Sequence, residues 1–184
     1  MPTHFRLIVA GALAGLSLAA SCSPTPRAAA RAPATSMPSM AGIAPDVQQD
    51  VMRLRDATAR FRDLDAAVSA GYARDVEQCI AHPPHGAMGF HHVNRGYVDT
   101  RIEVERPEIL TYERAADGRR VLTGAEYIIP YRLWPADSAP PTAFGQNLRH
   151  ADDLRLWYLH VWVWKENSSG LFADWNPAVR CPEG

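Results

Sequence analysis

The chain has few cysteines, no run of basic residues and, after its N-terminus, no long apolar run. Only 3 of its 184 residues are cysteine, and its formal net charge is −1. A nearly neutral chain without a basic run gives no sign of binding nucleic acid. The sequence also contains no G-x-S-x-G or H-E-x-x-H motif and no phosphate-binding glycine loop. The common signatures of serine hydrolases, zinc peptidases and nucleotide-binding proteins are therefore absent from it.

The N-terminus carries the one continuous apolar run. Residues 7–20 are all apolar or small. This run is shorter than the roughly 20 residues that a membrane-spanning helix needs, so it predicts a signal peptide over residues 1–21. Small residues then lead into Cys22, which resembles the lipobox of bacterial lipoproteins. Ala19 departs from that pattern, because the lipobox usually has leucine at this position.

The lipobox resemblance implies that Cys22 is lipidated and anchors the protein to a membrane. Ser23, rather than aspartate, follows the cysteine, which in such lipoproteins implies the outer membrane. Plain secretion of a soluble protein is the alternative. Residues 22–45 are rich in Ala, Pro, Ser and Thr and predict a disordered tether.

Residues 46–184 are long enough to form one domain with its own apolar core. Apolar residues recur at steps of three and four over residues 46–70, which predicts a single amphipathic helix. Asp46 and Gln49 fit a capping box at its start, and Gly71 is a natural stop.

Beyond Tyr72 the pattern changes to strands and turns. Residues 108–114 and 121–131 flank a turn and predict a hairpin, and residues 154–164 predict a central strand because both faces are apolar. The sequence therefore predicts an α+β fold, with one N-terminal amphipathic helix packed on a curved antiparallel sheet. Such a sheet and helix could form either a cystatin-like or NTF2-like cone or a small barrel.

Cys79 and Cys181 are the two cysteines of the domain. An even pair in an exported domain predicts a disulfide, which here would close about 100 residues. The rival interpretation makes the Cys79 thiolate a metal ligand beside the histidines that follow it.

Four of the seven histidines lie within residues 82–92, a stretch whose prolines and glycines predict a shaped loop. Imidazole is the commonest ligand for transition metals, so the cluster predicts a mononuclear zinc or copper site. Adjacent histidines in extended chain point to opposite sides, so only one of the pair that ends the cluster would join it. Two polar residues within apolar strands complete the candidate ligands, which are His82, His85, His91, His92, His160 and Glu126.

Metal handling by an extracytoplasmic lipoprotein, rather than catalysis, is the function that these features favour. A histidine loop whose rings bond backbone carbonyls is the simpler structural alternative. A module that binds a small ligand, in a pocket of Trp157, Tyr158 and Trp162 between sheet and helix, is a second function. A metal-dependent enzyme of unknown reaction is a third.

Several blocks of the domain resemble a family of small exported bacterial proteins without known activity. The blocks are Gly-Ala-Met-Gly-Phe-His from Gly86, Arg-Pro-Glu-Ile-Leu from Arg106, Leu-His-Val-Trp-Val-Trp from Leu159 and Phe-Ala-Asp-Trp-Asn-Pro from Phe172. The resemblance spans roughly residues 71–181. It implies export and a single domain, and it implies no activity and no site residue.

Overall fold

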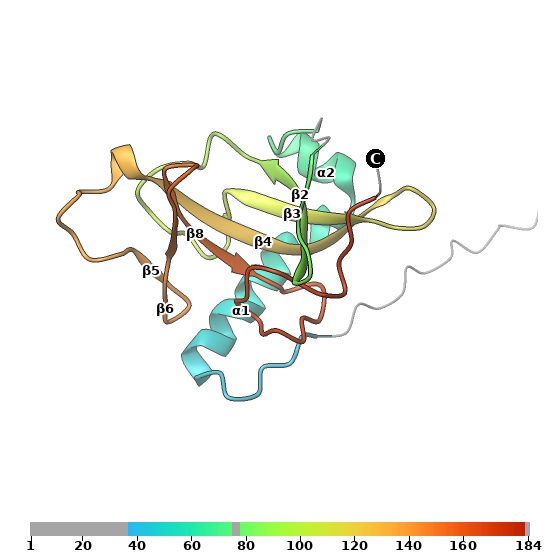
Figure 1. Ribbon diagram of the computed structural model, residues 1–184, viewed down its shortest axis with the longest axis horizontal. Coiled ribbons are helices and arrows are strands. Elements are labelled where there is room, and N and C mark those ends of the chain that lie inside the picture. The colour runs from blue at the N-terminus through green and yellow to red at the C-terminus, as the bar shows by residue number, and fades with distance from the viewer. Residues whose placement is uncertain (1–36, 75–77, 183–184) are drawn as a thin grey trace, which may run out of the picture. The chain divides into compact units, whose positions relative to one another are not determined.

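The structure is a computed structural model that describes residues 37–74 and 78–182 (Figure 1). The predicted signal peptide and Cys22 lie outside these residues. Helices come first and strands follow, which confirms the α+β fold. The helical segments are α1 (Pro45–Thr58), η1 (Ala59–Arg62), α2 (Leu64–Ser69) and η2 (Tyr131–Leu133). The strands are β1 (Cys79–His82), β2 (Gly86–Val93), β3 (Ile109–Arg114), β4 (Arg120–Pro130), β5 (Thr142–Ala143), β6 (Gln146–Asn147), β7 (Arg149–Ala151) and β8 (Leu156–Val161).

The predicted single helix is divided into α1, η1 and α2. Asp63 interrupts it with an extended backbone, and its side chain accepts a hydrogen bond from the backbone N–H of Asp65. Asp63 therefore caps a new helix, because an aspartate before a helix satisfies one of its free N–H groups. The predicted capping box is wrong, since α1 begins at Pro45 and its N-cap, Ala44, makes no side-chain bond. None of the described helices is long and apolar enough to cross a membrane.

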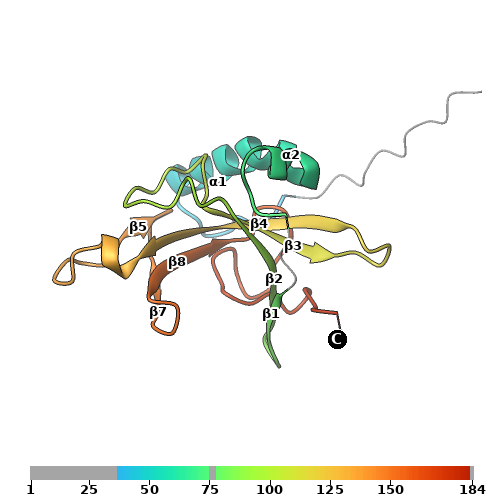
Figure 2. The ribbon, with the colours of Figure 1, turned by 90° about the horizontal axis from the view of Figure 1, so that it is seen from above.

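Six strands form one antiparallel sheet in the order β1-β2-β3-β4-β8-β7. The sheet curls into a half-barrel, and Figure 2 shows β1 and β7 on the side away from α1 and α2. The predicted hairpin is β3–β4, and the predicted central strand is β8. The predicted histidine loop is instead a second hairpin, β1–β2, because only the residues between His82 and Gly86 form its turn.

The face of the sheet toward the helices is closed by apolar packing. Val51 and Leu54 of α1 are fully buried in one cluster with sheet residues such as Tyr127 and Leu159. Truncating a leucine in such a place to alanine costs about 2–5 kcal/mol. This face therefore supplies much of the stability of the fold.

The C-terminal segment covers part of the opposite face. A disulfide joins Cys79 to Cys181, as predicted. Ala87 and Asn176 form an isolated antiparallel bridge through two backbone hydrogen bonds. Gly86 permits this approach, because a side chain there would lie 2.1 Å from the carbonyl oxygen of Asn176. Residues 171–175 of this segment form turns and no strand.

Part of the predicted tether belongs to the ordered domain. Met40 and Ile43 pack against the core, and the backbone N–H of Ser39 donates to Glu166. The described part of the tether therefore lies against the domain instead of extending from it.

Candidate metal centre

Three of the predicted ligands meet on the face of the sheet away from the helices. His91 lies on β2, Glu126 on β4 and His160 on β8, and Glu126 is the direct cross-strand partner of His160. One ligand atom from each residue lies within 4.8 Å of the other two. Among residues 37–74 and 78–182, this is the one group of three such side chains close enough to hold a metal ion.

His91 and Glu126 form a buried pair without net charge in the metal-free protein. The Nε2 atom of His91 is 3.3 Å from Oε2 of Glu126. Burial lowers the pKa of His91 to about 4, and the backbone of Gly89 opposes this shift. Burial also raises the pKa of Glu126 to about 8, and the carboxylate of Asp174 adds to that shift. Both groups are therefore neutral at pH 7.

His160 is the most deeply placed member of the group. Its side chain is fully buried, and burial lowers its pKa well below the usual value for histidine. Its Nε2 atom lies 3.4 Å from the hydroxyl of Thr111, and its ring stacks on Trp162. Its Nδ1 atom has no hydrogen-bond partner among the described residues. A buried imidazole nitrogen without a partner costs free energy, unless it binds something else.

Gly124 keeps open the space beside His160. A side chain on Gly124 would lie 3.3 Å from Nε2 of His160 and from the hydroxyl of Thr111, and 2.5 Å from the carbonyl oxygen of Val161. Gly124 is also the cross-strand partner of Thr111, which in turn pairs with His91. Any larger residue would force these strands apart at the candidate centre.

The centre opens into a cleft of about 630 Å³. His91 and Glu126 line this cleft together with residues from both edge strands, including Ile80 of β1 and Ala151 of β7. The sheet therefore curls around the cleft. This volume falls within the range of small-molecule sites, roughly 300–1,000 Å³.

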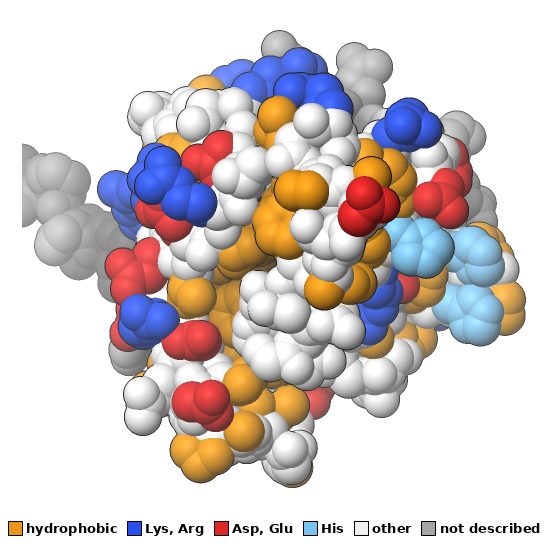
Figure 3. Space-filling view, turned by 90° about the vertical axis from the view of Figure 1, so that its left-hand side faces the viewer, with side chains coloured by type: hydrophobic (Ala, Val, Ile, Leu, Met, Phe, Trp, Pro, Cys, Tyr) orange, Lys and Arg blue, Asp and Glu red, His pale blue; other side chains and the backbone are white. Residues whose placement is uncertain are grey.

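The other predicted ligands lie elsewhere. His92 points to the helix side of β2, where its Nδ1 contacts the carbonyl oxygen of Ala73 and its ring meets Tyr112 edge to face. The prediction that the adjacent pair divides between two faces is thus confirmed. His82 and His85 are exposed, and His82 stacks on both His85 and Trp175. Figure 3 shows histidine side chains gathered at one edge of the molecular surface, beside apolar ones.

The predicted aromatic pocket between sheet and helix is wrong. The apolar cleft lies on the opposite face and includes Tyr158. Trp162 is fully buried against His160, and Trp157 lines a separate hollow with Tyr131. Side-chain alternation along β8 separates Trp157 from Tyr158, and Trp162 lies just beyond the end of this strand.

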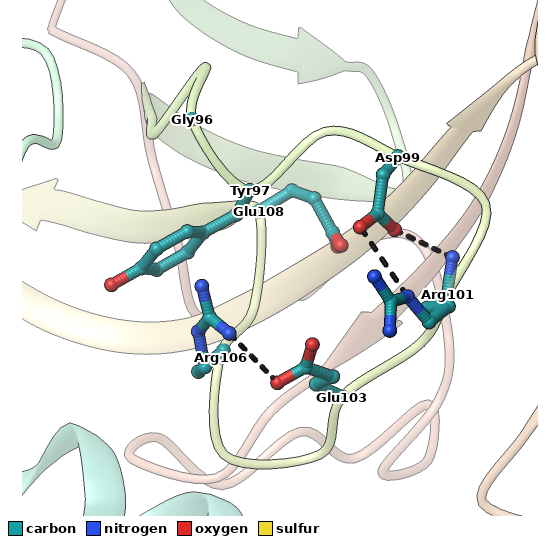
Figure 4. A pocket seen from close by; sticks show the side chains of 7 residues that line it. All are labelled: Gly96, Tyr97, Asp99, Arg101, Glu103, Arg106 and Glu108. Carbon is teal, nitrogen blue, oxygen red and sulfur yellow. Dashed lines mark hydrogen bonds and ion pairs between the residues drawn. The ribbon is translucent and has the colours of Figure 1, made fainter.

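A second, charged hollow lies beside the segment that precedes β3 (Figure 4). Its polar groups largely satisfy one another. Glu103 forms an ion pair with Arg106 at 3.0 Å, and the carboxylate of Asp99 accepts a hydrogen bond from the backbone N–H of Arg101. Glu108 points into it and accepts a hydrogen bond from the backbone N–H of Ile128. Burial raises the pKa of Glu108 to about 8. Because its charges are internally paired, this hollow is a weaker candidate than the cleft.

Sequence reasoning missed the residues that support the centre. Thr111 and Gly124 carry no local signal, because their importance depends on which strands become neighbours. The hairpin that joins Thr111 to Gly124 was predicted, but the pairing of β2 with β3 and of β4 with β8 could not be derived from the pattern.

Comparisons of the chain with protein-family models, curated proteins and solved structures found no match. The resemblance to exported bacterial proteins therefore stays a prediction. The disulfide between Cys79 and Cys181 does indicate an oxidising compartment, because cytosolic proteins seldom keep such bonds.

Proposed function

We propose that this protein is an exported protein that binds a transition metal through His91, Glu126 and His160. The observation that carries the proposal is the convergence of these three side chains, two buried and that of His91 mostly buried, to within 4.8 Å. Burying a carboxyl group and two imidazoles is costly without partners. A bound cation would compensate that cost for all three at once.

The donor set favours zinc or copper. Two imidazole nitrogens and one carboxylate oxygen suit these ions, whereas magnesium and calcium prefer oxygen ligands alone. The Thr111 hydroxyl lies near Nε2 of His160 and would help to fix the ring, whose Nδ1 has no hydrogen-bond partner among the described residues. Such outer partners fix the ring and strengthen ligation.

Metal binding would displace a proton from the centre. Glu126, with its pKa raised to about 8, holds a proton at pH 7 and must release it to coordinate a cation. His91 and His160 are already neutral, because burial lowers the pKa of both. The proposal thus includes the release of about one proton for each metal ion bound near pH 7.

Titration calorimetry with zinc and copper on the full chain, purified without a histidine tag, tests the proposal. We expect one ion per chain in the wild type and loss of binding in Glu126→Gln and His160→Asn. His150→Ala is the matched control, because His150 lines the cleft but is exposed and outside the group. Equal binding by the wild type and both site variants would refute the proposed site.

Attachment to the outer membrane through a lipidated Cys22 completes the proposal. The lipobox resemblance at Cys22 and the disulfide of the domain support it. Metabolic labelling with a palmitate analogue should mark the wild-type chain and leave Cys22→Ser unlabelled. An unlabelled wild-type chain in the culture medium would favour plain secretion.

A further inference from the structure

The cleft in front of the candidate centre has mainly apolar walls. All six strands of the curled sheet contribute residues to them, chiefly Ile80, Met88, Val93, Ile109, Ile128 and Leu156. An apolar cleft of about 630 Å³ is larger than a metal ion and its waters require. The cleft is therefore shaped for an organic molecule.

Polar groups occur at two places in the cleft. Glu126 is buried and His91 is mostly buried in it, whereas His150, Asp152 and Asp153 are exposed. The hydroxyl of Tyr131 donates to Asp152, and His150 lies 3.4 Å from the same carboxylate. An apolar body would thus occupy the middle of the cleft, with one polar group directed to the centre.

Three protein ligands leave a coordination position for a further donor. Metal centres that bind substrates have three protein ligands and one exchangeable position, whereas structural zinc centres have four protein ligands. His91 and Glu126 both line the cleft, so the position between them is reached from it. An oxygen donor is the simplest partner for zinc or copper in that position.

We infer that the cleft binds a small molecule with a mainly apolar body and one oxygen-donor group that reaches the metal. This inference rests on the proposed metal centre. It makes the protein a receptor for an organic ligand through its metal.

Two hydroxamic acids test the inference because they share one metal-binding group and differ in their apolar tail. Octanohydroxamic acid and acetohydroxamic acid are titrated into the full chain loaded with zinc, with Trp175 at the cleft providing a fluorescence signal. We expect octanohydroxamic acid to bind at least tenfold more tightly. Zinc content is measured before and after each titration.

Two variants of the cleft wall and one control test whether the apolar tail of octanohydroxamic acid lies in the cleft. Ile80→Glu and Leu156→Glu introduce charge at partly exposed wall positions and should reduce the tenfold preference to less than threefold. Zinc stoichiometry and affinity for acetohydroxamic acid should stay unchanged. Met52→Glu is the control, because Met52 is 53% exposed on α1 and outside the cleft. It should keep the full preference.

The outcomes separate the inference from the proposed function. Stoichiometric zinc with equal affinity for both acids overturns the inference and leaves the metal centre intact. A preference that survives in both wall variants overturns it as well. Absence of zinc binding overturns the metal centre, and the inference with it. Tight binding of octanohydroxamic acid to metal-free protein would refute the role of the metal in ligand binding.

Discussion

His91 and His92 are neighbours in β2, but they belong to opposite faces of one sheet. The face of His92 is closed by α1 and α2 and packed with apolar side chains. The face of His91 is lined by edge strands and a C-terminal segment, and it leaves a cleft. The same residue type thus has a structural role on one face and a candidate ligand role on the other. The elements that cover each face, and not the residue type, therefore decide whether a histidine on that face can act as a ligand.

Removing the disulfide should have the largest effect on the free energy of unfolding. It tests whether this bond stabilises the C-terminal segment on the cleft face. The double variant Cys79→Ser, Cys181→Ser opens a bond between residues 102 apart in sequence. On the chain-entropy model this lowers the free energy of unfolding by about 4–5 kcal/mol. Urea unfolding measures the change, and the double variant should no longer respond to dithiothreitol. An unchanged unfolding free energy would show that packing alone fixes the C-terminal segment.

Replacing each of the adjacent histidines tests the comparison directly. His91→Ala should weaken zinc binding by more than about 100-fold, because it removes a ligand and not only an outer partner. His92→Ala should keep the zinc affinity and lower the unfolding free energy by about 1–2 kcal/mol, since a buried hydrogen-bonding group is lost. Calorimetry and urea unfolding distinguish the two. Equal zinc affinities in the two variants would contradict the division between faces.

Two buried carboxyl groups should make the stability of the metal-free protein depend on pH. The pKa values of Glu126 and Glu108 are both raised to about 8, mainly by burial, from an ordinary value of 4.5. Each folded-state pKa exceeds the unfolded one, so each contribution to stability is fully present below about pH 4.5 and is lost as pH rises toward 8. The expected slope is at most about 1.4 kcal/mol per pH unit for each group.

Glutamine variants separate these two carboxyl groups. Glu126→Gln and Glu108→Gln should each flatten the fall in metal-free stability between about pH 6.5 and 8, as measured by urea unfolding in a pH series. Below about pH 6.5 the buried histidines, whose pKa values are lowered, oppose this fall. Only Glu126→Gln should lose zinc binding, because Glu108 points into the charged hollow of Figure 4. Loss of zinc binding in both variants would mean that the charged hollow is coupled to the metal centre.

The exposed histidines should produce the smallest effects. His82→Ala and His85→Ala remove rings that stack at the surface beside Trp175. Exposed substitutions of this kind change stability by about 0.5 kcal/mol or less. Zinc affinity should stay within about twofold of the wild type. A tenfold loss in calorimetry would place the metal at the β1–β2 turn instead of the cleft.

Local sequence patterns predicted most of the helices and strands, because the formation of each depends mainly on residues that are neighbours in the chain. The helical stripe before Gly71, the apolar strand around His160 and the cysteine pair are all visible in the sequence. The break at Asp63 was missed because apolar spacing continues through it, while the capping bond depends on backbone geometry. The β1–β2 hairpin was missed because its prolines and glycines suggested a loop throughout.

The site was only partly predictable, for a different reason. His91, His160 and Glu126 were all candidates, but closeness in sequence gave more weight to His82 and His85, which lie outside the group. The registers that bring the three together join strands far apart in the chain, as the pairing of Glu126 with His160 shows. Side-chain alternation could say that His91 and His92 separate, but it could not say which face would stay open.

The bond between Cys79 and Cys181 also makes one covalent ring of much of the domain. Every strand, from β1 to β8, and all three candidate ligands lie between these cysteines, whereas α1 and α2 precede the ring. A protease that cuts an exposed turn inside the ring, such as residues 136–140, leaves both pieces joined by the disulfide. The candidate centre can thus survive a single cut without losing a ligand by diffusion.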